Sequence, residues 1–267
     1  MSSTGSNAPQ VLVLGSGTST GVPLIGCRCE VCASRDPRDC RLRSSVYITC
    51  GGFAALIDVS PDFRQQALRH ELPRVDAILL THPHADHVFG LDDIRRYNTL
   101  QQASIPAYVR DFTFRGVSRM FSYIVAPTEA QKGMYRPQIE FHETGDATVD
   151  VGPFSMTSLE IPHGPARSTA FKLEHQGRAF VYAPDCSEMS DAFRAFIRGA
   201  DCVMLDGLRD REHAGHLTIE NSVAAMREAG VRRGFITHIS HDIPHARLEQ
   251  RLPPPVAAAY DGLSFEW

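Results

Sequence analysis

The stretch "THPHADHVFG" (residues 81–90) contains His82, His84, Asp86 and His87, and it follows the apolar run "VDAILL" (residues 75–80) directly. An apolar run of this length, with turn-forming residues after it, is typical of a buried strand. Neutral imidazoles and carboxylates are the usual ligands of zinc, manganese and iron. The stretch therefore predicts metal ligands at the end of a strand.

The chain repeats one order of elements. A hairpin "SSVYITCGGFAALID" (44–58), an amphipathic helix "PDFRQQALRHEL" (61–72) and the strand 75–80 are followed later by a hairpin (168–185), a helix (187–200) and a strand (201–207). A further helix (218–230) and strand (231–238) end on His238. This alternation predicts an α/β fold. The repetition predicts two sheets packed face to face, with strand ends of both halves meeting at one site.

Composition limits the class of protein. A chain of 267 residues with 43% hydrophobic content is expected to form a single domain over residues 1–267. A net charge of −4 disfavours a long nucleic acid as partner. The N-terminus has no apolar segment of signal-peptide or membrane-span length, which predicts a cytoplasmic protein without a membrane partner. Seven cysteines, most of them scattered, predict reduced thiols rather than a disulfide framework.

Acidic and histidine side chains recur after apolar runs or in loops marked by glycine and proline. The set comprises Asp58, His82, His84, Asp86, His87, His163, Asp185, His216 and His238. A paired metal site needs about six to eight such ligands around ions roughly 4 Å apart. The number of candidates fits two ions better than one.

The pattern HxHxDH at residues 82–87, with the isolated His163, Asp185 and His238, resembles the metallo-β-lactamase superfamily. The resemblance implies an αββα sandwich, two mixed β-sheets packed face to face with helices outside. It also implies that the ligands of one ion are His82, His84 and His163, and those of the other Asp86, His87 and His238. Asp185 would bridge the ions, and Asp58 would orient a ligand. True β-lactam hydrolases commonly have cysteine in place of Asp185; the adjacent Cys186 is expected to be a small buried side chain.

A second motif is CxCxxC, within "GTSTGVPLIGCRCEVC" (residues 17–32), and His241 lies three residues after His238. This arrangement resembles the phosphoribosyl 1,2-cyclic phosphate phosphodiesterases of phosphonate catabolism. That resemblance implies a structural zinc on Cys27, Cys29, Cys32 and His241. The pyrroloquinoline quinone biosynthesis protein B family has a similar cysteine cluster, so the cluster alone does not determine the reaction.

The segment "GHLT" (residues 215–218) is the third signal, since phosphodiesterases of this superfamily, including the tRNA 3′-processing endonuclease, tend to have histidine at the position of His216. Near the metals, its imidazolium would stabilise negative charge or protonate a leaving oxygen. The alternative is a neighbour of the helix N-cap, with Thr218 starting the helix. His213 is a weaker candidate in the same loop.

These features predict a dinuclear phosphodiesterase for small, including cyclic, phosphodiesters, with Asp86 and His216 as catalytic residues. Two ions, zinc or manganese, would activate a bridging water for attack on phosphorus. Arg95 or Arg96 would contact phosphate, or else lie on a solvated helix face. The alternatives are a carboxylic ester or thioester hydrolase, an RNA-processing nuclease and a non-catalytic metal-binding accessory protein. Residues 105–142 have the least pattern, and a lid, a homodimer contact and a wall of the substrate site remain alternatives.

Overall fold

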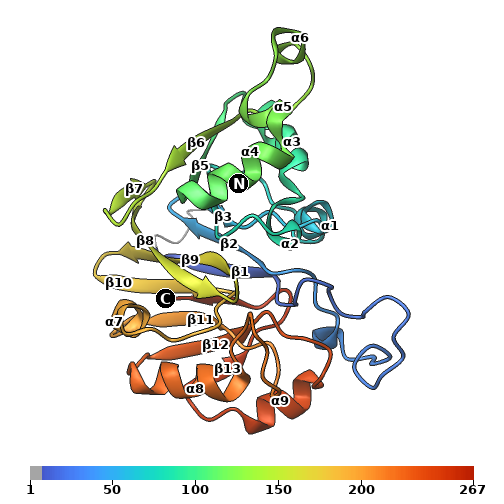
Figure 1. Cartoon of the computed structure of the whole chain (residues 1–267), viewed down its shortest axis with the longest axis vertical. Helices are drawn as coiled ribbons and strands as arrows, with labels where there is room; N and C mark the ends of the chain where they lie inside the picture. Colours follow the sequence, from blue (N-terminus) through green and yellow to red (C-terminus); the bar gives the residue numbers. More distant parts are fainter. Residues whose placement is uncertain (1–7) are drawn as a thin grey trace, which may run out of the picture.

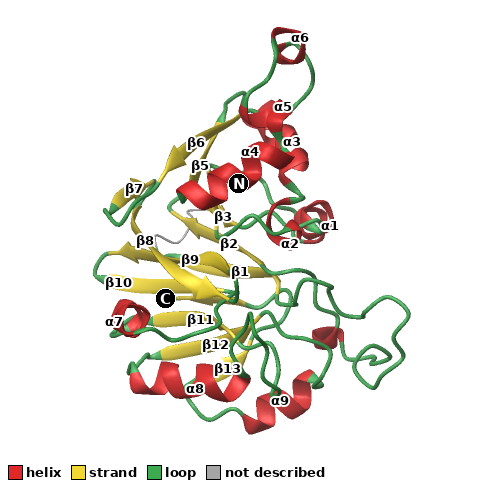
Figure 2. Cartoon of the chain, in the orientation of Figure 1, coloured by secondary structure: helices red, strands yellow, loops and turns green. Residues whose placement is uncertain are grey.

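Two seven-stranded sheets form the centre of the fold (Figures 1 and 2), in a computed structural model that describes residues 8–267. The first sheet has the order β14 (Ser264–Glu266), β1 (Gln10–Gly15), β2 (Ser45–Cys50), β3 (Phe53–Ile57), β4 (Ala77–Leu80), β5 (Ile105–Val109) and β6 (Ile139–Glu143). The second has the order β13 (Val256–Ala258), β12 (Arg233–Thr237), β11 (Cys202–Asp206), β10 (Arg178–Ala183), β9 (Ala166–His175), β8 (Phe154–His163) and β7 (Val149–Val151).

Both sheets are mixed, and the same pairing occurs in each. The hairpin β2–β3 is antiparallel and is followed by the parallel strands β4, β5 and β6. In the second sheet the hairpin β9–β10 is antiparallel and is followed by the parallel strands β11, β12 and β13. The repeated order of elements predicted from the sequence is confirmed for both halves.

Helices cover the outer face of each sheet. With the first half are α1 (Phe63–Arg69), α2 (Ala85–Val88), η2 (Leu91–Ile94), α3 (Arg95–Gln101), α4 (Asp111–Met120), α5 (Ser122–Val125) and α6 (Glu129–Lys132). With the second are α7 (Asp191–Ile197), α8 (Ile219–Glu228) and α9 (His245–Arg251). A short 3-10 helix, η1 (Pro37–Asp39), lies in the segment that projects on the right of Figure 1. Among residues 8–267, no helix combines the length and the apolar character that crossing a membrane requires.

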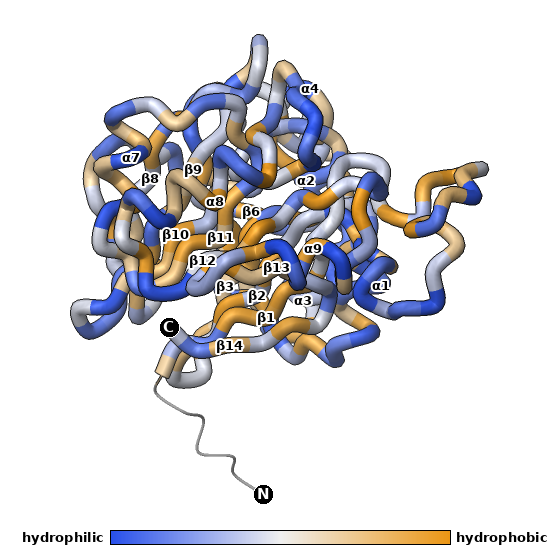
Figure 3. The backbone as a smooth tube through the Cα atoms, turned by 90° about the horizontal axis from the view of Figure 1, so that it is seen from below, coloured by the Kyte–Doolittle hydropathy of each residue, from blue (hydrophilic) through white to orange (hydrophobic). Residues whose placement is uncertain are grey.

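Three apolar layers hold these elements together. The middle layer joins the two sheets through residues such as Ile48 and Ile57 of the first and Phe171 and Phe180 of the second, with Trp267 among them. Separate apolar clusters lie under the helices of each half. In Figure 3 the inner strands are largely orange and α1 is largely blue, as expected for helices that bury one face only. This is the predicted αββα sandwich.

The parallel strands of both halves end on polar residues. Asp58 follows β3 directly, His82 lies two residues after β4, Asp206 is the last residue of β11, and His238 follows β12. Asp58 and His238 have φ values of 62° and 59°, in the left-handed region that non-glycine residues rarely occupy. The chain therefore turns sharply at both strand ends and leaves the side chains at the edge where the sheets meet.

Residues 105–142, which had little sequence pattern, contribute two strands and three helices. β5 and β6 extend the first sheet, and β6 is an edge strand of five residues whose Ile139 and Phe141 are half-buried against the apolar cluster of the first half. Within this segment, the short helix α6 lies between α5 and β6. In α4, a Cβ at Gly116 would lie 2.3 Å from Cβ of Pro83, and Thr113 Oγ1 donates to the Thr81 carbonyl at 3.3 Å. This segment therefore supports the loop that carries the HxHxDH motif.

Candidate metal centre

Three imidazole nitrogens converge at the ends of β4 and β8. His82 lies in the loop after β4, His84 is the N-cap of α2, and His163 is the last residue of β8. His84 Nδ1 lies 2.9 Å from His82 Nε2 and 3.3 Å from His163 Nε2. His82 and His163 are buried, whereas His84 is exposed. We call these residues the first triad.

A second triad, Asp86, His87 and His238, lies beside the first. His87 Nε2 is 3.1 Å from Asp86 Oδ2, and His238 Nε2 is 3.6 Å from the same oxygen. Asp185 faces both triads, because its Oδ2 is 3.1 Å from His87 Nε2 while its Oδ1 is 3.7 Å from His163 Nε2. The structure thus brings all seven predicted catalytic metal ligands together.

The donor atoms of this centre fit divalent metal ions. His87 Nε2, His238 Nε2 and Asp185 Oδ2 are buried and have no hydrogen-bond partner within residues 8–267. Buried polar atoms without partners are costly, and they are rare in proteins unless a ligand or water satisfies them. Imidazole nitrogens and carboxylate oxygens aimed at common points are suitable ligands for zinc or manganese.

The protonation states favour metal binding in the first triad and at Asp185. Burial lowers the pKa values of His82 and His163, and partial desolvation of the ring followed by His163 lowers that of the more exposed His84, which favours neutral imidazoles. Burial alone would raise the pKa of Asp185, but His238 and His87 outweigh it and hold that pKa well below its usual range. Metal ligands must be deprotonated, so these shifts reduce competition from protons.

Hydrogen bonds fix the second nitrogen of several ligand imidazoles. His87 Nδ1 lies 2.7 Å from Asp58 Oδ2, and the Thr81 backbone N–H donates to Asp58 Oδ1 at 2.8 Å. His163 Nδ1 is 2.6 Å from the Gly215 carbonyl oxygen. Such partners orient a ligand ring toward a metal. Asp58 therefore lies where a residue that orients His87 is expected.

His216 lies against the centre without joining either triad. Its Nδ1 is 2.8 Å from Asp206 Oδ2 and 3.8 Å from Asp185 Oδ1, and its ring stacks on His238 with centroids 4.7 Å apart. Burial lowers the pKa of His216 and raises that of Asp206. Thr218 is the N-cap of α8, because its Oγ1 accepts from the Asn221 N–H. His216 has no part in this cap, and its ring faces the metal centre.

Asp206 is a site residue that the sequence reasoning missed. It is fully buried, and besides His216 it accepts a hydrogen bond from the Cys186 N–H at 2.9 Å. The signal was its position at the end of the strand "DCVMLDG", because Asp58 and Asp185 also follow strands. An aspartate before glycine is also common in turns, so its position alone does not indicate a site residue.

Other candidates lie away from the ligands. His213 is exposed, with its ring centroid 5.1 Å from that of His216, and it lines a cavity of about 460 Å³ together with His216 and Ser187. Arg95 pairs with Asp92 at 2.7 Å, and Arg96 lines a groove formed by α1 and α3, which favours the helix-face alternative for both arginines. Cys186 is fully buried in the apolar layer beside α7.

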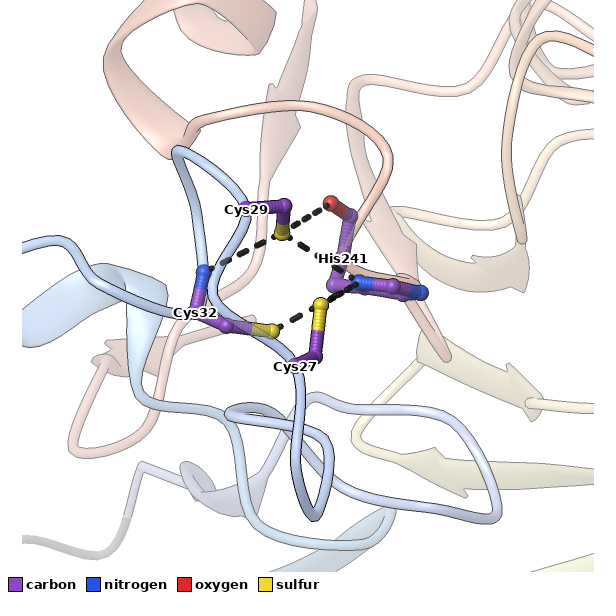
Figure 4. Close-up of side chains that lie close together, drawn as sticks. All are labelled: Cys27, Cys29, Cys32 and His241. Atoms are coloured by element: carbon purple, nitrogen blue, oxygen red, sulfur yellow. Dashed lines mark hydrogen bonds between the residues drawn. The ribbon is translucent and has the colours of Figure 1, made fainter.

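A separate cluster of four side chains lies where the projecting segment, which carries three cysteines, meets the loop after β12, which carries His241 (Figure 4). The Sγ atoms of Cys27, Cys29 and Cys32 lie 3.5, 3.4 and 3.5 Å from His241 Nδ1. A donated hydrogen bond from the Cys32 N–H, followed by His241, lowers the pKa of Cys29 to about 6. Three thiolates and one imidazole around a common point are a suitable set for tetrahedral zinc. We call this group the cysteine cluster.

Comparison with known proteins agrees with this geometry. The family model for the β-lactamase superfamily domain matches residues 55–239. The chain belongs to the metallo-β-lactamase superfamily. The predicted superfamily and fold are therefore confirmed.

Among solved structures of this superfamily, a diphosphatase from the PhnP family is similar over 97% of both chains, with 37% identity and a TM-score of 0.88. Zn²⁺-bound PqqB from Methylobacterium extorquens covers 97% of the chain with 23% identity and a TM-score of 0.80, a likeness of fold. An octanoyltransferase of Porphyromonas gingivalis is 34% identical over 258 residues, but the chain spans only 50% of its length.

Proposed function

We propose that this hydrolase cleaves small phosphodiesters with two divalent ions, zinc or manganese, held by the two triads and Asp185. The observation that carries the proposal is the position of Asp185, whose two oxygens face both triads at 3.1 to 3.7 Å while His216 lies beside it. A single-ion site does not require a buried carboxylate shared in this way. Bound ions would activate water and offset the negative charge of a phosphoryl group.

The side chains of both triads are held in place before substrate binds. The first triad presents neutral imidazoles, and Asp58 with Thr81 holds His87 in one orientation within the second. Asp86 is a ligand in the second triad and thereby contributes to catalysis. Because both triads are fixed by strand ends and hydrogen bonds, the ligand positions need little rearrangement when substrate binds.

His216 is the proposed acid. Its Nδ1 is engaged by Asp206, which leaves Nε2 to interact with the substrate. Burial lowers the pKa of His216, but Asp185 acts in the opposite direction, and the negative charge of a bound phosphodiester would add to that effect. A proton held at Nε2 would then pass to the oxygen that leaves phosphorus, a contribution of about 10² to 10⁴-fold for a positioned acid. Asp206 would act through His216 by fixing the ring.

The size and charge of the site favour a small substrate. A cavity of about 460 Å³ lies beside His216 and is lined by none of the seven proposed metal ligands, so in this proposal it would receive the part of a small substrate that extends past His216. The net charge of −4 also disfavours long RNA. The similarity to a PhnP-family diphosphatase supports a second candidate substrate class, compounds with a diphosphate linkage.

The experiment is a substrate panel measured with Mn²⁺ and with Zn²⁺. It contains bis-p-nitrophenyl phosphate, a ribose cyclic phosphate, a dinucleoside diphosphate, a short RNA, p-nitrophenyl acetate and an acyl thioester. We expect turnover of the phosphodiesters, and loss of that turnover in Asp185→Asn. Preference for the diphosphate would favour the second candidate. Turnover only of the carboxylic esters would contradict both, and no turnover at all would favour a metal-binding accessory protein.

A further inference from the structure

One short loop carries a ligand of the second triad and a ligand of the cysteine cluster. His238 belongs to the second triad, His241 belongs to the cysteine cluster, and only Ile239 and Ser240 separate them. The left-handed φ of 59° at His238 is a strained conformation for a residue other than glycine. Such a conformation persists where the surrounding structure holds it. The contacts of this loop therefore matter for the position of His238.

The loop is held by the Leu208 carbonyl, which accepts from the Ser240 N–H at 3.0 Å, and by residues from the N-terminal part of the chain. Ile239 N–H donates to the Ser16 carbonyl at 2.9 Å, and Thr18 N–H donates to the Ile239 carbonyl at 3.3 Å. The fully buried Arg41 donates to the carbonyl oxygens of Ser240 and of Ile243, the latter at 3.0 Å. The contacts with Ser16, Thr18 and Arg41 link the His238 loop to residues that flank the cysteine motif.

Arg41 connects these contacts to the cysteine cluster itself. The backbones of Val22 and Arg41 exchange two hydrogen bonds of 2.8 Å, which close the base of the loop that carries the three cysteines. Asp39 pairs with Arg41 at 3.0 Å and also accepts from the His245 N–H at 2.7 Å. Figure 4 shows the cysteines on one ribbon and His241 on another, so a metal ion there would join the two chain segments.

We propose that a metal ion in the cysteine cluster positions His238, and so strengthens binding of the neighbouring ion by Asp86, His87 and His238. Through His241 the ion fixes one end of a short loop, and Arg41 fixes the carbonyls on both sides of His241. Without the cluster ion, the loop would lose its attachment at His241. The first triad has no residue on this loop, so its ion should be little affected. This inference rests on the proposed pair of metal sites and not on the proposed substrate.

The test compares Mn²⁺ binding by proteins with and without the cluster ion. Mn²⁺ prefers carboxylate and imidazole ligands over thiolates, so it reports the catalytic centre alone. Protein is stripped of catalytic metal, its cluster zinc is verified by elemental analysis, and Mn²⁺ is titrated by calorimetry and by electron paramagnetic resonance. Cys29→Ser removes a cluster ligand. Cys40→Ser is the matched control, because Cys40 lies on the same loop but outside the cluster.

For the unmodified protein and Cys40→Ser we expect two Mn²⁺ ions and the spectrum of a spin-coupled pair. For Cys29→Ser we expect one Mn²⁺ to bind as before and the second to bind 10- to 100-fold more weakly, the range typical of residues that orient a ligand. At one equivalent the spectrum should be that of a single ion. Cys29→His, which restores a zinc ligand, should recover much of the second affinity.

The proposal would be overturned if both Mn²⁺ dissociation constants of zinc-free Cys29→Ser lay within twofold of the Cys40→Ser values. It would also be overturned if the two Mn²⁺ ions were weakened equally. If Cys29→Ser does not fold, the same titration is made on Cys40→Ser before and after an organomercurial removes the cluster zinc. Because the readout is metal affinity, failure of the phosphodiesterase assay would leave this result interpretable. Failure to bind any Mn²⁺ in the unmodified protein would contradict the metal centre itself.

Discussion

Asp206 Oδ2 and His216 Nδ1 lie 2.8 Å apart, and the Asp206 side chain is fully buried. This pair fixes the ring of the proposed acid through Nδ1. A buried carboxylate that holds the Nδ1 side of a catalytic imidazole sets the tautomer and the ring orientation. In this proposal Asp206 orients the imidazole, and His216 donates the proton.

His216→Ala should retain both metal ions and slow the chemical step in a way that depends on the leaving group. A phosphodiester that expels nitrophenolate needs little protonation, so its rate should change little, whereas one that expels a sugar alkoxide should slow by about 10² to 10⁴-fold. Asp206→Asn should show a smaller form of the same difference. Equal slowing with both leaving groups would instead indicate charge stabilisation, and loss of an ion would make His216 a ligand.

His84→Ala should lose catalytic metal and activity while keeping its fold. His84 is exposed and forms the N-cap of the four-residue helix α2, so no strand packing depends on its side chain. Elemental analysis should show about one ion fewer than in the unmodified protein, with an unchanged circular dichroism spectrum. Retention of both ions and of full turnover would contradict the first triad.

Asp58→Asn should weaken binding of the ion at the second triad by about 10- to 100-fold. The carboxylate lies 2.7 Å from His87 Nδ1 and is completely buried, so the amide would lose a charged partner for that ring. Competition with a chromogenic chelator measures the affinity. Asp62→Asn, on a residue that pairs with Arg43 away from the triads, is the control.

Cys29→Ser should also lower thermal stability, since a structural metal site contributes folding free energy directly. A domain of this size loses about 2–4 °C in Tm for each kcal/mol, so a decrease of several degrees is expected. Differential scanning calorimetry with elemental analysis should show this decrease together with the loss of about one zinc. An unmodified protein that contains zinc only at the catalytic centre would contradict the cysteine cluster as a metal site.

Asp261 predicts a pH dependence of stability. Its carboxylate accepts hydrogen bonds from Ser16 and from the Leu42 N–H, but burial dominates and raises its pKa to about 6. A pKa raised by folding means that stability is greatest below the unfolded value and decreases as pH rises toward about 6, by up to ~3 kcal/mol. We therefore expect the free energy of unfolding of the unmodified, metal-free protein to exceed that of Asp261→Asn by more at pH 4.5 than at pH 7. Urea unfolding at both pH values measures this difference. The same difference at both pH values would contradict the raised pKa.

The ligands that were predicted from local pattern are those that follow a strand closely in the sequence. His82, His84, Asp86 and His87 lie within six positions after a buried strand, so local pattern was sufficient to find them. His241 lies 209 residues from Cys32, and no periodicity links the two; only the resemblance to a known family paired them. β6 escaped prediction because its alternation comprises only two apolar residues, Ile139 and Phe141, and its pairing with β5 is a tertiary contact.

The distribution of the ligands over the two sheets has a consequence for assembly. The four donors between residues 82 and 87 come from the first half of the chain, and His163, Asp185 and His238 come from the second, so neither half holds a complete set for either ion. Ions bound there would stabilise the docking of the halves as well as serve the reaction. Two fragments divided between β6 and β7 should therefore associate more tightly when divalent metal is present than when it is chelated.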